Sequence, residues 1–127
     1  MKAQMGAAIS IALICAAGTV TAQSGDAAKG ERVFNQQCKT CHTVEKGGRN
    51  GVGPNLFGMF GRKAGTVEGF SASDAMQKSG IVWDDKAVQE YLRDPRAKVP
   101  DAKMVFVGLK RQEQLDDVLA YLRKATQ

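Results

Sequence analysis

The chain has 127 residues, of which 43% are hydrophobic and 24% are charged; this is enough for one compact domain and excludes an intrinsically disordered chain. Its 18 Lys and Arg against 13 Asp and Glu give a net charge of +5 at pH 7. That density is too low for a nucleic-acid-binding protein and favours acidic protein partners. Because only 6% of the residues are aromatic, we expect a small core that some bound group helps to fill.

The first 22 residues are typical of a secretory signal peptide. They carry one charge, Lys2, followed by an apolar run and a small-residue stretch that ends at Ala22. Cleavage after Ala22 would release a mature domain of residues 23–127 into the periplasm, an oxidising compartment. A retained membrane anchor is the alternative, because residues 3–25 carry no charge and are long enough to span roughly 30 Å of hydrocarbon. We expect cleavage, because polar and small residues offset the few strongly apolar ones.

The rest of the chain is predicted to be helical, with helices over residues 27–38, 73–78, 85–93 and 113–125. Asp26 and Asp84 stand at N-cap positions of the first and third helices, and Pro95 ends the third. The last helix lacks a capping side chain, but its apolar residues form one stripe: Leu115, Val118, Leu119 and Leu122. No segment alternates like a strand, so the predicted fold class is mainly α.

A glycine-rich segment separates the first two helices. Residues 47–80 contain nine glycines in 34 residues and few periodic apolar positions. Long irregular segments in compact domains are usually functional or disordered. This one also carries large apolar side chains that need a surface to pack against: Leu56, Phe57, Met59, Phe60 and Phe70. A flat bound cofactor would supply that surface.

The motif Cys38-Lys39-Thr40-Cys41-His42 has the spacing of c-type haem attachment. Two thiols at this spacing can add across the two vinyl groups of a haem, and the next residue can then bind the iron. A redox dithiol or a disulfide is the alternative, but it expects a strand and a crossover helix around the motif, and none is predicted. A closed zinc site needs four Cys or His ligands, whereas the mature chain would have three.

His42 is the only histidine of the chain. It therefore serves either as the iron ligand or as a catalytic base, and the haem motif assigns it to the iron, so we expect no catalytic residues. The second axial ligand is then a methionine, a lysine, water or nothing. Three methionines lie in the mature domain, and Met104 is in the loop before the last helix, whereas Met59 and Met76 fit core positions.

The sequence from residue 25 to residue 126 resembles a class I cytochrome c of the mitochondrial and alpha-proteobacterial type. The resemblance extends over motifs in family order and spacing: Cys38 to Glu45, Gly53-Pro54-Asn55-Leu56, Gly61-Arg62-Lys63, Trp83, Glu90-Tyr91-Leu92, Asp94-Pro95, Lys103-Met104 and Ala120-Tyr121-Leu122. It implies a small fold of three to five helices wrapped around one haem c, bound through Cys38 and Cys41, with His42 and Met104 as the iron ligands.

The resemblance also implies roles for residues around the haem. The Pro54 carbonyl would accept the Nδ1 proton of His42 and fix its tautomer. Tyr91 would lie near the Met104 sulfur, and Trp83 and Arg62 would lie near a haem propionate. Gly30 would occupy the crossing of the first and last helices, against Tyr121 and beside Phe34.

Four residues depart from the common family pattern. Ala72 and Ala102 replace a Tyr and a Thr that bind a propionate in many relatives, and Met76 replaces an Asn on the distal side. We expect the reduction potential and the stability of the Met104 loop to differ accordingly. Asn50 stands where some relatives have a loop histidine.

The function implied by the resemblance is one-electron transfer by a non-enzymatic carrier. A periplasmic shuttle would connect a quinol:cytochrome c oxidoreductase with a cytochrome oxidase or a reaction centre, both of them membrane redox complexes. A dedicated electron acceptor of a periplasmic dehydrogenase is one alternative. A haem peroxidase or gas-binding protein is another, and it would require an open sixth position on the iron.

The predicted docking surface is basic. Residues 93–111 contain two anions, Asp94 and Asp101, against six cations: Arg93, Arg96, Lys98, Lys103, Lys110 and Arg111. Since this segment brackets Met104, we expect positive charge around the exposed haem edge, where it would steer acidic partners. The small size favours a monomer. We expect no stable membrane insertion once the signal peptide is cleaved, and the low charge density argues against nucleic-acid binding.

Overall fold

The computed structural model describes residues 24–127 and contains five helices. They are α1 (Ala27–Gln37), α2 (Asp74–Lys78), α3 (Asp85–Arg93), α4 (Pro95–Lys98) and α5 (Gln112–Ala125). Between these residues the only extended pairing is an isolated antiparallel bridge of Lys63 with Val82. The mainly α class with three to five helices is thus confirmed. The predicted signal peptide lies outside the described residues.

The predicted helix boundaries agree with the structure to within a residue, and their caps explain why. The Asp26 side chain accepts hydrogen bonds from the N–H groups of Ala28 and Lys29 at 2.9 and 3.1 Å. The Asp84 side chain accepts one from Ala87 N–H at 2.7 Å. As expected, α5 has no side-chain cap. These local hydrogen bonds satisfy amide groups that the helix itself leaves unpaired.

Helix α4 was not predicted from the sequence. Pro95 ends α3, as expected, but it is also the first residue of this next, single-turn helix. Proline suits that position because its missing N–H has no partner there and its φ is already helical. The Asp94 side chain caps the turn by accepting from Ala97 N–H at 3.1 Å. Four residues are too few to show a helical period.

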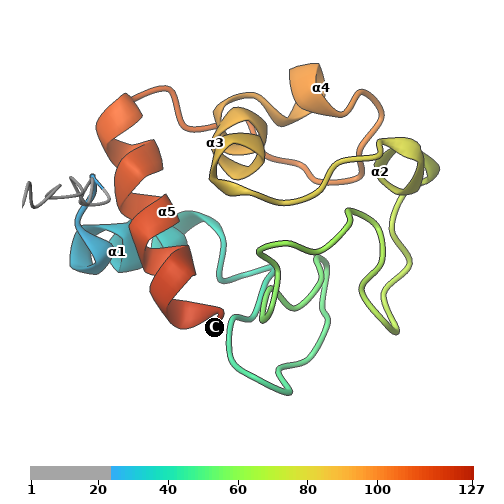
Figure 1. Cartoon of the computed structure of the whole chain (residues 1–127), viewed down its shortest axis with the longest axis horizontal. Helices are drawn as coiled ribbons and strands as arrows, with labels where there is room; N and C mark the ends of the chain where they lie inside the picture. The colour runs from blue at the N-terminus through green and yellow to red at the C-terminus, as the bar shows by residue number, and fades with distance from the viewer. Residues whose placement is uncertain (1–23) are drawn as a thin grey trace, which may run out of the picture.

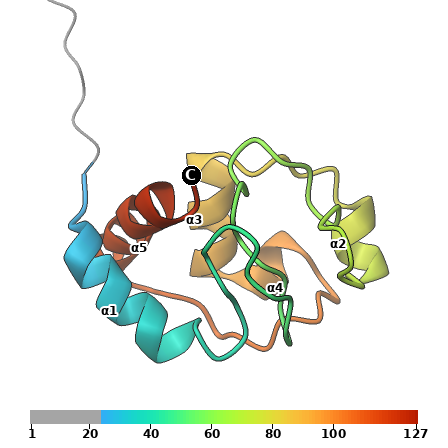
Figure 2. The same ribbon diagram turned by 90° about the horizontal axis from the view of Figure 1, so that it is seen from below.

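Helices α1 and α5 cross at one end of the molecule, with α2 at the other end and the glycine-rich loop between them (Figures 1 and 2). At the crossing, a Cβ on Gly30 would lie 1.9 Å from the carbonyl oxygen of Asp117, so only glycine allows this approach. The Phe34 and Tyr121 rings pack beside it with centroids 5.3 Å apart. The expected placement of Gly30 is confirmed.

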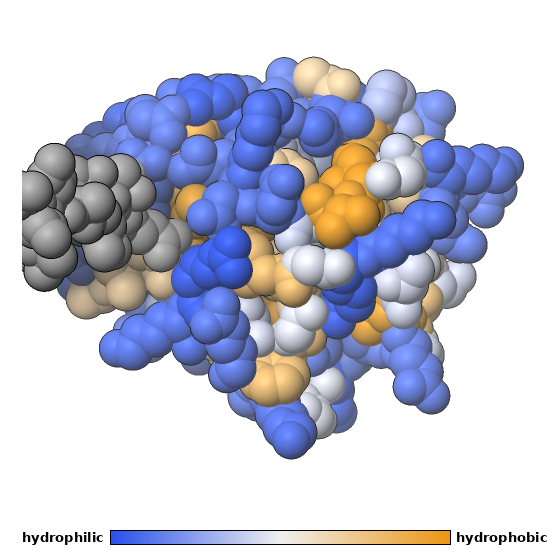
Figure 3. All heavy atoms as spheres, in the orientation of Figure 1, coloured by the Kyte–Doolittle hydropathy of each residue, from blue (hydrophilic) through white to orange (hydrophobic). Residues whose placement is uncertain are grey.

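The core is formed chiefly by the apolar stripe of α5, which packs against α1 and α3. The four predicted residues of the stripe are buried, and Phe34 of α1 and Val88 of α3 pack with them: Leu115, Val118, Leu119 and Leu122. Asp117 is also buried, at 6% exposure, and its carboxylate accepts from the Asp26 N–H at 2.7 Å. In the view of Figure 3 the surface is largely hydrophilic, with small apolar patches between charged side chains. Among residues 24–127, no helix is long and apolar enough to cross a membrane.

Candidate functional site

A cavity of about 260 Å³ lies between the glycine-rich loop, α3, α5 and the segment after α4. Its walls are mainly apolar. The four residues that the sequence predicts as haem and iron ligands all line it: Cys38, Cys41, His42 and Met104. Of the large apolar side chains in the glycine-rich loop, Leu56, Met59 and Phe70 line it too, so a cofactor bound here could pack against them.

Phe57 and Phe60 depart from that expectation, because neither contributes to the cavity wall. Phe60 packs against the protein core instead, and the Arg123 guanidinium carbon lies 3.9 Å from its ring centroid. This cation–π contact joins the loop to the end of α5. Phe60 and Arg123 are 63 positions apart in the sequence, so a local sequence pattern could not reveal this contact.

The two cysteines and the histidine lie on one turn that follows α1. Cys38 is the C-cap of α1, and the N–H groups of Cys41 and His42 both donate to the Cys38 carbonyl at 3.0 Å. Neither cysteine forms a disulfide, and both are half-buried. Burial raises the pKa of the Cys38 thiol to about 11, with Cys41 adding a smaller effect. A redox dithiol needs a low-pKa thiolate, and the shift of the Cys38 pKa is in the opposite direction.

The His42 ring is held by backbone on two sides. Its Nδ1 lies 2.8 Å from the carbonyl oxygen of Pro54, as expected. A Cβ on Gly53 would lie 2.4 Å from Cε1 of the ring, so the backbone there must be glycine. Burial lowers the pKa of His42, and the bond to Pro54 opposes this shift. A neutral imidazole that donates Nδ1–H to Pro54 keeps the Nε2 lone pair free for a metal.

The position of Pro54 depends on a hydrogen-bond network that the sequence analysis missed. Asn55 donates its side-chain amide to Thr43 Oγ1 at 2.7 Å and to the Glu45 carbonyl at 3.0 Å. Asn50 accepts from the Asn55 N–H at 2.8 Å and donates to the Glu68 carbonyl at 3.0 Å. Asn50 therefore fixes the loop around His42. The sequence signal for this network was the presence of two asparagines in a glycine-rich segment, because asparagine side chains commonly form hydrogen bonds with the backbone of turns.

All three methionines of the described chain line the cavity. Met59 is 7% exposed and belongs to the hydrophobic core, as expected for a packing residue. Met76 lies on α2, whose backbone fixes its position. Met104 is half-buried in a segment without helix or strand, and unlike Met59 it is not a member of the hydrophobic core.

The cavity is lined by one polar group without a hydrogen-bond partner and by one cation without an anionic partner among residues 24–127. The Tyr91 hydroxyl is buried and has no hydrogen-bond partner, and burial raises the pKa of Tyr91 to about 12. The Arg62 guanidinium donates to the Phe57 carbonyl at 3.1 Å but forms no salt bridge with any residue in 24–127. The buried Tyr91 hydroxyl needs a hydrogen-bond partner, and the half-buried Arg62 guanidinium can still bind an anion. A bound group with carboxylates and a second polar contact would satisfy both.

These features fit a haem. The donor set contains two thiols, an imidazole and a thioether, and the wall between them is mainly apolar and includes the guanidinium of Arg62. The Trp83 ring lines the same cavity and packs on Tyr91, with ring centroids 5.3 Å apart. The expected contacts of Trp83 and Arg62 with a propionate remain predictions.

The basic segment is only partly placed at the cavity. Of its six cations, Lys103 lines the cavity, where Arg62 and Lys63 from the glycine-rich loop join it. Lys98 instead binds Glu90, and Lys110 donates to the Arg93 carbonyl at 2.8 Å. Lys98 and Lys110 therefore make contacts within the fold.

Comparison with known proteins identifies the family. The cytochrome c family model matches residues 27–126. A cytochrome c2 of Blastochloris viridis is 47% identical over 111 residues, which cover 87% of this chain and 87% of that protein. A cytochrome c of Nigella damascena is 43% identical over 105 residues, covering 83% of this chain and 95% of that protein. A cytochrome c of Chlamydomonas reinhardtii is 46% identical over 105 residues, covering 83% and 94%.

Family members bind haem c covalently and carry electrons, and the cavity described above has the donors that this cofactor requires. The chain therefore belongs to the cytochrome c family, as a class I member whose cofactor is haem c.

Proposed function

We propose that Cys38 and Cys41 form the two thioether bonds to haem c, and that His42 and Met104 are its axial iron ligands. The observation that carries this assignment is that all four side chains line one apolar cavity. The turn after α1 presents both thiols and the imidazole from one short segment. Met104 comes from a segment far away in sequence.

The bound haem supplies a reversible one-electron iron couple. The surrounding residues suit it to electron transfer rather than to turnover. With His42 and Met104 as iron ligands, no position would remain for oxygen or a substrate, and a thioether ligand would favour the ferrous form. The Pro54 carbonyl and the Gly53 backbone hold the imidazole in one orientation. Little reorganisation is then needed when the charge of the iron changes.

The haem edge would be accessible at the mouth of the cavity. Val52 and Val105 both line the cavity, and they are 80% and 94% exposed. Residues that line an internal cavity and still face water mark its opening. Lys103 lies on the same lining, so an acidic partner would meet both a positive charge and an apolar contact there.

The chain would act as a periplasmic electron shuttle between a quinol-oxidising membrane complex and a terminal oxidase or reaction centre. The similarity to a cytochrome c2 and the moderate positive charge support this function. Residues 1–22 would be removed as a signal peptide, and residues 23–127 would form the mature, monomeric carrier. A periplasmic dehydrogenase as the sole electron donor is the alternative.

Carbon monoxide and a matched pair of variants test the ligand assignment. In wild-type protein the ferrous iron should resist carbon monoxide at neutral pH, because both axial positions are filled. Met104→Ala should bind it rapidly and lose the weak far-red ferric band that accompanies sulfur ligation. Met76→Ala removes a thioether from the same cavity and should change neither property. Retention of the band in Met104→Ala would reject the assignment.

A further inference from the structure

The segment that carries Met104 is anchored at its two ends and at two points between them, where Phe106 packs against the hydrophobic core and Lys103 donates to the Ser71 carbonyl at 3.3 Å. We call residues 99–108 the Met104 strap, and none of them lies in a helix or strand. The strap begins at Val99, which is 2% exposed, and ends next to Leu109, which is 3% exposed. The Leu109 N–H donates to the carbonyl oxygen of Leu92 on α3 at 2.7 Å. The position of Met104 therefore depends in part on what fixes the first of these ends.

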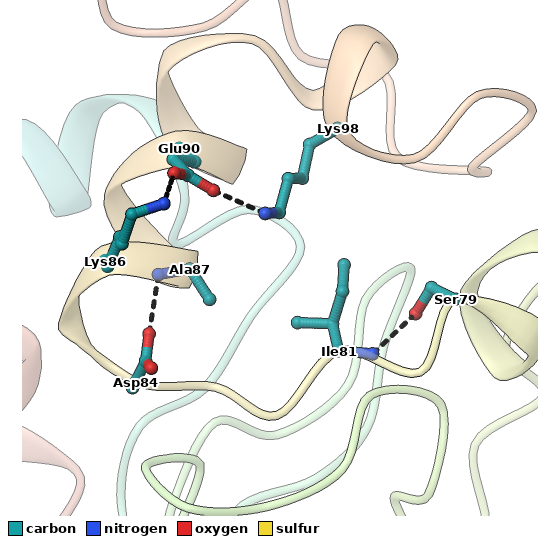
Figure 4. Close-up of polar contacts among 7 residues, drawn as sticks. All are labelled: Ser79, Ile81, Asp84, Lys86, Ala87, Glu90 and Lys98. Atoms are coloured by element: carbon teal, nitrogen blue, oxygen red, sulfur yellow. Dashed lines mark hydrogen bonds and ion pairs between the residues drawn. The ribbon is translucent and has the colours of Figure 1, made fainter.

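The helix that precedes the strap cannot fix it alone. Helix α4 has four residues, and its only side-chain cap is Asp94. A single helical turn is unstable by itself, because the conformational entropy lost in forming the first turn exceeds the stabilisation by its few hydrogen bonds. Lys98, the last residue of α4, provides an outside link: its ammonium binds the carboxylate of Glu90 on α3 (Figure 4).

The Glu90 carboxylate binds two lysines that differ in what they connect. Lys86 lies one turn earlier on α3 and contacts Oε1, whereas Lys98 contacts Oε2 from α4. The Lys86 side chain is 81% exposed and the Lys98 side chain 29%. Hydrogen bonds from Lys86 and then from Lys98 lower the pKa of Glu90 from 4.5 to about 2. The carboxylate is thus ionised at neutral pH, and only its pair with Lys98 joins two helices.

We propose that Glu90 is a positioning residue for Met104, because by binding Lys98 it ties α4 to α3 and fixes the first end of the Met104 strap. This inference rests on the proposed function, in which Met104 binds the iron. When the pair is broken, α4 and the strap gain freedom, and the thioether leaves the iron more often. Breaking the pair with Lys86 has no such effect, because both of its residues lie on α3.

Binding of added imidazole to the ferric holoprotein measures how often the thioether leaves. The Lys98→Gln and Glu90→Gln variants should each raise the apparent imidazole affinity about threefold, the size expected for loss of a half-exposed ion pair. Lys86→Gln is the matched control, because it removes the same charge and an ion pair with the same carboxylate. Its affinity should equal that of wild type. Exchanging the charges, with Glu90→Lys and Lys98→Glu together, should restore the wild-type affinity.

An unchanged affinity in Lys98→Gln would overturn the inference, as would an equal increase in Lys86→Gln. Global unfolding, followed by far-UV circular dichroism in denaturant, separates positioning from stability. The two lysine variants should unfold at similar denaturant concentrations, because each loses one ion pair with Glu90; imidazole affinities that follow the unfolding midpoints in both variants would also overturn it. The far-red band of Met104→Ala tests the proposed function independently. A band that survives there rejects the ligand assignment, whereas a band that is lost leaves the lysine variants to decide the role of Glu90.

Discussion

The Nδ1 atom of His42 lies 2.8 Å from the carbonyl oxygen of Pro54, and the residue before that proline lies directly against the same imidazole. One dipeptide thus both orients the ring and limits the space around it. A hydrogen bond to the non-ligating nitrogen increases the basicity of the other one. The relationship makes the backbone at residues 53–54 part of the iron site.

Gly53→Ala should therefore disturb the haem site. The added Cβ would lie 2.4 Å from Cε1 and 2.8 Å from Nδ1 of His42, so the ring or the loop must move. We expect a loss of about 1 to 3 kcal/mol in the free energy of unfolding and a changed reduction potential. Denaturant titration and voltammetry measure the two effects. Gly51→Ala is the control, because its Cβ would meet its nearest neighbour, the Cys41 carbonyl, at 3.5 Å; an equal effect there would contradict the explanation.

Gly30→Ala should destabilise the crossing of α1 and α5. In an exposed helix, replacing glycine by alanine stabilises by roughly 1 kcal/mol. Here the new Cβ would lie 1.9 Å from the Asp117 carbonyl oxygen and 2.9 Å from Tyr121 Cβ. The helices must separate, so we expect a net loss of about 2 kcal/mol or more in denaturant unfolding. A stabilised variant would show that the helices do not approach this closely.

The contribution of Glu90 to stability should depend on pH in a defined direction. The pKa of Glu90 is lowered from 4.5 to about 2 in the folded chain. Its ionised form therefore stabilises the fold above the unfolded value, and that contribution is lost as the pH falls from about 4.5 toward about 2. The unfolding midpoints of wild type and Glu90→Gln should differ at neutral pH and converge across this window. A constant difference would contradict the shifted pKa.

Electron transfer with a small anionic reagent should report the charge at the cavity mouth. Reduction of the ferric protein by hexacyanoferrate(II) should slow as salt is added, because salt screens the attraction. Lys103→Gln should lower the rate at low salt and flatten its salt dependence, since Lys103 lines the cavity. Lys124→Gln, at the last turn of α5, is the control and should have a smaller effect. A rate independent of salt would refute electrostatic steering.

The sequence predicts what depends on neighbouring residues. The caps Asp26 and Asp84 and the stripe of α5 are local patterns, and the structure confirms them. The Cys-x-x-Cys-His turn is local as well. The contact of His42 with Pro54 was expected only through the family resemblance, because twelve positions separate the two residues.

The features that sequence reasoning missed depend on tertiary contacts. Helix α4 is too short for a period and is fixed by the pair of Lys98 with Glu90, eight positions apart. Asn50 fixes the loop around His42 through a carbonyl eighteen positions away. The segment 93–111 was expected to place its cations at the haem edge, but net charge gives no information on which lysines are engaged in structural bonds. These contacts become visible only in the folded structure.

Covalent attachment of haem through Cys38 and Cys41 is the central claim, and intact mass spectrometry of the purified, denatured protein tests it most directly. The account predicts residues 23–127 plus the mass of one haem, with no thiol that reacts with an alkylating reagent. A colourless chain with two alkylatable thiols at Cys38 and Cys41 would contradict it.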